Sequence, residues 1–142
     1  GKGTTSVSFD IGLKALKVGD TNWAARVGIV GYTHWNRPGH VEKSFAEFEI
    51  RRDGSMFGSG GSLGNIGSYV ADPNIGVTIT ASIDRKTSQI TWKVNGTNAV
   101  TKSVAASDMT GAYLQVGSNV EDASHTAWMD NISVSVSPKA DE

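Results

Sequence analysis

The sequence predicts an all-β protein that folds as a single two-sheet antiparallel β-sandwich. Glycine makes up 17 of the 142 residues, which is above the ~7% of average proteins and typical of a chain with many tight turns. Apolar residues recur at every second position in several segments, and no segment shows a convincing helical period. Because 142 residues suit one domain, we expect residues 1–142 to form one jelly-roll sandwich with flexible ends at 1–5 and 138–142.

The predicted strands of the first half follow this alternation. In residues 6–13, the apolar side chains from Val7 to Leu13 occupy every second position, which is the pattern of a half-buried strand. The glycine-rich residues 58–67 are expected to form a loop. Further strands are expected at residues 25–32, 45–51 and 56–57.

The second half continues this pattern up to the C-terminus. Strands are expected at residues 76–83, 89–94, 97–104, 113–118 and 128–136. Asn95-Gly96 joins two of them directly, which predicts a type I′ hairpin because both central residues of that turn need positive φ. Trp92 shares the parity of its apolar neighbours and is expected in the core. The last strand is expected to point three apolar side chains inward, those of Ile132, Val134 and Val136.

Charge and composition exclude several classes of function. Thirteen Lys and Arg residues against 14 Asp and Glu residues give a net charge of -1, so no global basic field would hold nucleic acid or an anionic membrane. With no cysteine, the chain has neither disulfides nor a zinc-thiolate site. No apolar stretch approaches the ~20 residues that a membrane span needs. We expect a soluble piece of a larger protein.

Four runs carry a resemblance to a known family. They are VTITASID at 77–84, QITWKVNG at 89–96, AYLQVG at 112–117 and WMDNISV at 128–134. This succession of strands and turns resembles the C-terminal half of concanavalin-A-like and laminin-G-like jelly rolls, which include non-catalytic carbohydrate-binding modules of bacterial polysaccharide lyases and hydrolases. The resemblance implies a secreted module, monomeric within a larger enzyme, whose partner is a polysaccharide.

One loop concentrates the side chains that sugar binding needs. In residues 31–40, aromatic rings that stack on pyranose faces lie beside planar polar groups that read hydroxyls or carboxylates. The predicted ligand-binding residues are Tyr32, His34, Trp35, Asn36 and Arg37 of this loop, with Arg26, Glu49 and Arg51 from neighbouring strands. Arg26, Arg51 and Lys93 would favour an acidic, uronate-containing glycan if they share one face. Alternatively, Trp35 closes the end of the sandwich and Arg37 pairs with Glu42.

The remaining candidates carry open alternatives. Asp130 resembles the position of a structural calcium ligand in such jelly rolls, with Asp10 as a possible partner; alternatively, Asp130 and Asn131 cap a turn. Trp23 and Trp128 each fit either a binding platform or the edge of the core.

Catalysis is the less favoured reading. Glu47 and Glu49 have the two-residue spacing of a glycosidase carboxylate pair, but they equally fit an exposed charged stripe. We expect no enzyme; a small polysaccharide lyase or glycoside hydrolase and a laminin-G-like protein-binding domain stay as alternatives.

Overall fold

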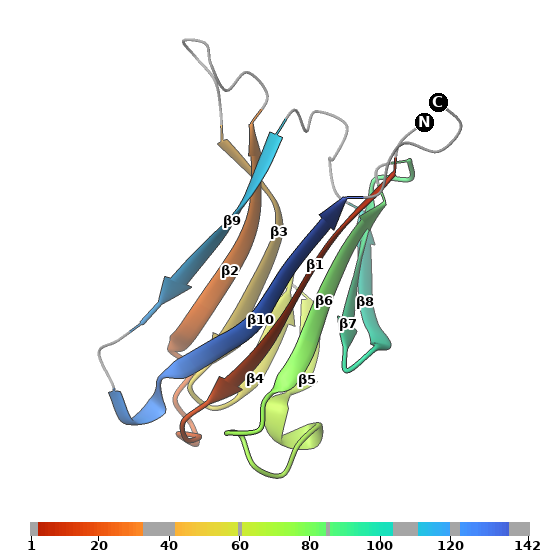
Figure 1. The fold of residues 1–142 in the computed structure, drawn as a ribbon. Coiled ribbons are helices and arrows are strands. Elements are labelled where there is room, and N and C mark those ends of the chain that lie inside the picture. Colours follow the sequence, from red (N-terminus) through yellow and green to blue (C-terminus); the bar gives the residue numbers. More distant parts are fainter. Residues whose placement is uncertain are drawn as a thin grey trace.

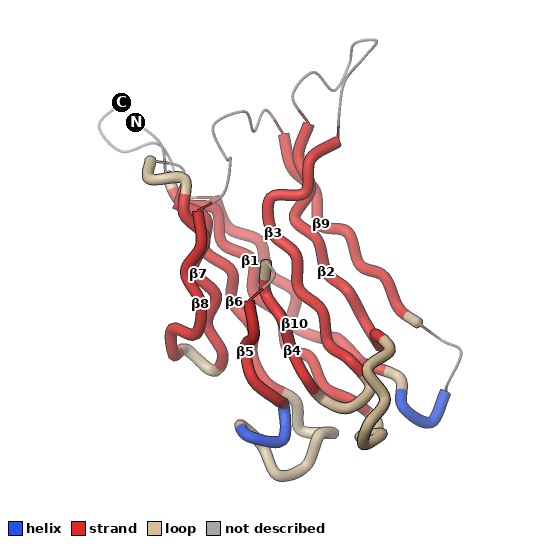
Figure 2. Tube along the Cα trace, turned by 180° about the vertical axis from the view of Figure 1, so that it is seen from behind, coloured by secondary structure: helices blue, strands red, loops and turns tan. Residues whose placement is uncertain are grey.

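The computed structural model describes residues 3–32, 42–59, 61–84, 86–103, 111–119 and 123–136. Within them, ten strands form two antiparallel five-stranded sheets packed face to face (Figures 1 and 2). The strand order is β10-β1-β6-β7-β8 in the first sheet and β5-β4-β3-β2-β9 in the second. This confirms the predicted two-sheet sandwich and is consistent with a jelly roll. No helix in the described part of the chain is long and apolar enough to span a membrane.

The strand boundaries agree with the alternation in the sequence to within a few residues at most positions. The strands are β1 Thr4–Leu13, β2 Trp23–Tyr32, β3 Glu42–Arg51, β4 Ser55–Gly58, β5 Gly61–Asn65, β6 Val77–Asp84, β7 Gln89–Val94, β8 Thr97–Ser103, β9 Gly111–Ser118 and β10 Ala127–Val136. Two short 3-10 helices cover Ile66–Ser68 and Ala123–His125.

The core lies between the inner faces of the two sheets. Phe9 of β1 meets Phe48 of β3 edge to face, with ring centroids 5.3 Å apart, and Trp92 of β7 lies 6.3 Å from Phe48. Aromatic pairs at these separations stabilise a core beyond the burial of their surface. The prediction that Trp92 is buried is confirmed, and its indole Nε1 donates a hydrogen bond to Ser59 Oγ at 3.1 Å.

The predicted hairpin at Asn95-Gly96 is also confirmed. Both residues have positive φ, 51° and 82°, as a type I′ turn requires. The Asn95 side chain accepts a hydrogen bond from the backbone N–H of Thr78 at 2.9 Å, which ties the turn to the neighbouring strand β6.

Two predictions about local structure were wrong. Residues 61–65 form strand β5, which pairs with β4, whereas the glycine-rich segment 58–67 was expected to be a loop. Leu63 is buried from this strand, and one inward side chain is enough to hold it on the sheet. Residues 4 and 5 belong to β1 and pair with β6, and Thr5 is buried, so the N-terminal segment is ordered from there. The other predicted end, 138–142, lies outside the described residues.

One flank of the sandwich leaves its inner face open. Strand β8 lies beside β5 (Figure 2), so β10 and β9 form the edges of the opposite flank. Val134 pairs with the buried Val7, and this register places it on the inner face, as predicted together with Ile132. Both side chains are nevertheless 56% and 50% exposed, and Val116 of β9 is 49% exposed, because an edge strand has a neighbour on one side only. The side chain of Val136 lies outside the described residues.

Candidate functional site

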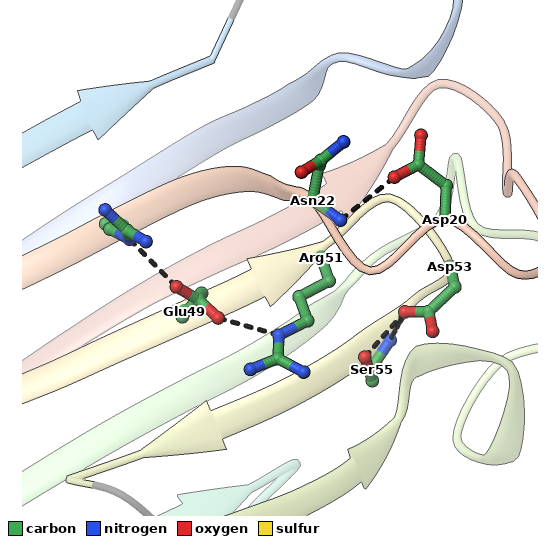
Figure 3. Close-up of polar contacts among 7 residues, drawn as sticks. Asp20, Asn22, Glu49, Arg51, Asp53 and Ser55 are labelled. Atoms are coloured by element: carbon green, nitrogen blue, oxygen red, sulfur yellow. Dashed lines mark hydrogen bonds and ion pairs between the residues drawn. The ribbon is translucent and has the colours of Figure 1, made fainter.

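Two arginines and a glutamate form a linked group on the outer face of the second sheet. Arg26 of β2 lies directly opposite Glu49 of β3. Its Nε donates to Glu49 Oε1 at 2.8 Å, and the Nε of Arg51 donates to Glu49 Oε2, also at 2.8 Å. Figure 3 shows Glu49 between its two donors. One carboxylate therefore fixes two guanidinium groups.

Each arginine also stacks on an aromatic ring. The Cζ atom of Arg26 lies 4.5 Å from the ring centroid of Trp23, and that of Arg51 lies 4.2 Å from the centroid of Phe57. Such cation–π contacts, together with the shared carboxylate, restrict the rotamers of both side chains. We call this group of Trp23, Arg26, Glu49, Arg51 and Phe57 the arginine face.

Strand alternation explains why these side chains share one surface. The neighbours of Arg26 and Glu49 along each strand, such as Val27 and Phe48, are buried in the core, so the intervening residues must point outward. A bulge between Trp23 and Ala25 changes the register at the start of β2. As a result, Trp23 lies opposite Arg51 on the outer face.

The electrostatics keep Glu49 ionised. Partial burial opposes ionisation, but the hydrogen bonds from Arg51 and Arg26 outweigh it and hold the pKa of Glu49 below its usual value. The side chains of Arg26 and Arg51 are 57% and 34% exposed. Because Glu49 uses only Nε of each, the terminal Nη groups remain as outward donors.

This arrangement bears on the glycosidase alternative. Glu47, exposed on the same face, is two residues from Glu49, as the sequence suggested. A glycosidase of either stereochemistry needs one carboxyl group with a raised pKa that acts as general acid. Glu49 has the opposite shift, so it is unsuited to that role.

Most residues of the predicted loop site lie outside the described part of the chain. His34, Trp35, Asn36 and Arg37 lie outside the described residues. Tyr32 is the last residue of β2, where its backbone pairs with β3 and β9, and its side chain is not described. At ~3.3 Å per residue, Tyr32 lies roughly 30 Å along β2 from Trp23.

The structure unites some of the predicted residues and separates others. Arg26, Glu49 and Arg51 are brought together. Lys93 is not, because β7 belongs to the first sheet and Lys93 pairs there with Thr80; the condition that all three side chains share one face is therefore not met. Sequence reasoning left Trp23 open and missed Phe57, whose only signal is its alternation with the buried Met56.

Asp10 and Asp130 lie opposite each other on the outer face of the first sheet. The Oδ1 of Asp10 accepts a hydrogen bond from Thr78 Oγ1 at 2.6 Å, and its Oδ2 accepts one from Asn131 Nδ2 at 2.7 Å. These two bonds, led by that from Asn131, lower the pKa of Asp10. Asp130 accepts from the backbone N–H of Asn131 at 2.8 Å.

Asp10 and Asp130 alone would not complete the shell of a calcium ion. Each oxygen of Asp10 accepts one hydrogen bond, and calcium takes six to eight oxygen ligands, water included. Within the described ranges, no cluster of three or more His, Asp or Glu side chains could hold a metal. Asn131 has φ 53° and lies at the register shift between β1 and β10, so Asp130 and Asn131 shape a β-bulge. The calcium site stays a prediction.

Comparison with known proteins identifies a similar fold. No protein-family model matches the sequence, and no curated protein matches it. Among solved structures, a chain described as a sialidase superposes with a TM-score of 0.61 at 12% sequence identity. The match covers 94% of this chain and 13% of the sialidase chain. The likeness shows a shared β-sandwich fold, and this chain spans about an eighth of the longer protein's length.

Proposed function

We propose that this chain is a non-catalytic carbohydrate-binding module and that its arginine face binds an acidic polysaccharide. The observation that carries the proposal is the pair of arginines, each stacked on an aromatic ring and both held by Glu49. A guanidinium group matches a carboxylate in a planar, two-bond geometry. Since both groups are already fixed, binding sacrifices little side-chain freedom.

The rest of the face supplies contacts for the neutral part of a sugar. Glu47 and Gln115 are exposed and flank Gly28 on adjacent strands, and their carboxylate and amide groups suit sugar hydroxyls. Trp23 and Phe57 are partly exposed and offer apolar ring surface to the C–H side of a pyranose. Uronate residues would then pair with Arg26 and Arg51.

The residues predicted from the sequence after Tyr32, namely His34, Trp35, Asn36 and Arg37, are proposed as further ligand-binding residues, since their rings and planar polar groups suit stacking on and hydrogen bonding to a sugar. The sialidase chain, in which a similar fold covers 13% of the length, supports a carbohydrate-related module within a larger protein. That the parent protein is secreted and acts on polysaccharides is part of the proposal.

Affinity electrophoresis in gels that contain polygalacturonate or alginate tests the proposal. The wild-type chain should be retarded, and Arg26→Ala/Arg51→Ala should migrate as in a glycan-free gel. Lys93→Ala is the matched control, because it removes a positive charge from the other sheet and should leave the retardation unchanged. The proposal is wrong if acidic glycans do not retard the wild type, or if they retard the double variant equally.

Product assays address the enzymatic alternative. A lyase or hydrolase would release unsaturated uronate absorbance or new reducing ends from the polymer that it binds. We expect neither, because a non-catalytic module binds the polymer without cleaving it.

A further inference from the structure

Trp128 lies on the outer face of the first sheet, on the opposite side of the sandwich from the arginine face. It belongs to β10 and lies opposite Gly12 of β1. A Cβ atom placed on Gly12 would be 2.5 Å from each of Nε1, Cε2 and Cζ2 of the indole. The indole therefore occupies the position that a side chain of residue 12 would take.

The indole also lies over a second glycine, Gly76. A Cβ atom on Gly76, just before β6, would be 2.7 Å from Cζ2 and Cη2 of Trp128. The indole therefore reaches from β10 across β1 to the start of β6. Gly12 and Gly76 are both buried, and any side chain at either position would lift the ring off the sheet.

Trp128 keeps part of its surface open to solvent, unlike Trp92, which the core surrounds. Ile75, which precedes Gly76 in the sequence, is 69% exposed and adds apolar surface at this end of the sheet. No arginine stacks on this ring among the described residues, and its exposed part is available to a ligand.

Polar groups next to the ring indicate which ligand it suits. Asp130 is exposed two residues along β10 on the same face, and Asp10 lies opposite it. Carboxylates accept hydrogen bonds from hydroxyl groups and repel other anions. A flat apolar ring beside hydroxyl-binding carboxylates matches a neutral sugar, and it disfavours the acidic glycan proposed for the other face.

We infer that Trp128 forms a second sugar-binding site, selective for neutral polysaccharides. The site differs from the arginine face in position, charge and ligand, so neither requires the other. Because the two sites lie on opposite outer faces, one molecule would bridge two polymers of different charge, and linked sites raise the overall avidity. The competing explanation is that Trp128 only shields two glycines, as aromatic side chains do in many sheets.

The test is affinity electrophoresis in gels that contain hydroxyethylcellulose, galactomannan or dextran. The wild type should be retarded by at least one of them, and Trp128→Ala should show about tenfold weaker binding, as expected for loss of one stacked ring. Val18→Ala is the control, since it trims an apolar side chain that is almost fully exposed elsewhere. Trp128→Phe keeps a smaller ring over the glycines and serves if Trp128→Ala does not fold, as judged by circular dichroism.

Each outcome decides the matter. Weaker retardation of Trp128→Ala or Trp128→Phe, with Val18→Ala unchanged, supports the second site. The inference is overturned if no neutral glycan retards the wild type, or if the folded Trp128 variants migrate like it. The acidic gels report separately on the arginine face, so the failure of one proposal leaves the other open to its own result.

Discussion

The packing of Trp128 over Gly12 and Gly76 predicts how much alanine at each glycine lowers the free energy of unfolding. Gly12 and Gly76 both lie under the indole, but they differ in backbone conformation. Gly76 has φ +75° and Gly12 is outside the left-handed region. Gly96 also has positive φ, +82°, and has no atom within 4 Å of its would-be Cβ. Alanine at these three positions therefore separates backbone strain from steric overlap.

The expected costs follow from these geometries. Gly96→Ala places a side chain in the left-handed region without a clash and should destabilise the fold by about 1–2 kcal/mol. Gly12→Ala forces the indole upward and should cost about 1–3 kcal/mol by overpacking. Gly76→Ala combines strain with overlap, including 2.6 Å to the carbonyl oxygen of Ile11, and should cost about 2–5 kcal/mol.

Urea denaturation of single and double variants measures these terms. In the Trp128→Ala background the ring is gone, so Gly12→Ala should cost almost nothing, and its coupling to Trp128 should account for most of its effect. Gly96→Ala should keep its full cost in that background, because it is remote from the ring. If Gly12→Ala is harmless in the wild type, or equally harmful without the tryptophan, then the indole does not lie on Gly12 and the second site loses its geometric basis.

Three further predictions concern stability. The hydrogen bonds to Asp10 lower its pKa below the unfolded value of ~3.9. This carboxylate therefore contributes stability that is present above about pH 4 and is lost as the pH falls through its folded pKa. Asp10→Asn should reduce the loss of unfolding free energy on acidification, and an unchanged loss would contradict this. Arg52 is only 5% exposed and its Nη1 donates to Asp20 Oδ2 at 3.3 Å, so Arg52→Ala should cost about 2–3 kcal/mol in denaturant unfolding, with the exposed Lys86→Ala as a neutral control. The calcium site predicted at Asp130 and Asp10 implies a higher melting temperature in calcium than in EDTA, and equal melting temperatures would contradict it.

Much of the fold could be predicted from the sequence because alternation is a local signal. From Val7 to Leu13, the alternation of apolar residues predicts which side chains face inward, and the burial of these side chains in the structure agrees. Strand β5 was not predicted because Leu63 is its one apolar inward-facing residue, and its glycines leave no alternation of apolar and polar residues to recognise. The exposure of Ile132 and Val134 could not be predicted either, because whether an inward side chain is covered depends on which strands form the edges.

The candidate site shows the same division. Parity correctly placed Arg26, Glu49 and Arg51 on outer faces. It could not reveal that Arg26 and Glu49 are cross-strand neighbours while Lys93 lies on the other sheet, since both facts depend on register and topology. The contact of Trp128 with Gly12 and Gly76 could not be predicted either, because the sheet brings together two glycines that are far apart in the sequence.

The bulge at Asn131 has a consequence for how this molecule behaves at high concentration. Strand β10 is an outermost strand, it carries no lysine or arginine, and the side chains of Ile132 and Val134 are half exposed, which are features that invite chain-to-chain sheet extension and fibril growth. A residue with φ 53° in the middle of this strand bends it and interrupts its row of free amide and carbonyl groups. An incoming straight strand can match only a few residues on either side. The bulge at Asn131 should therefore hinder β10 from pairing with a strand of another chain.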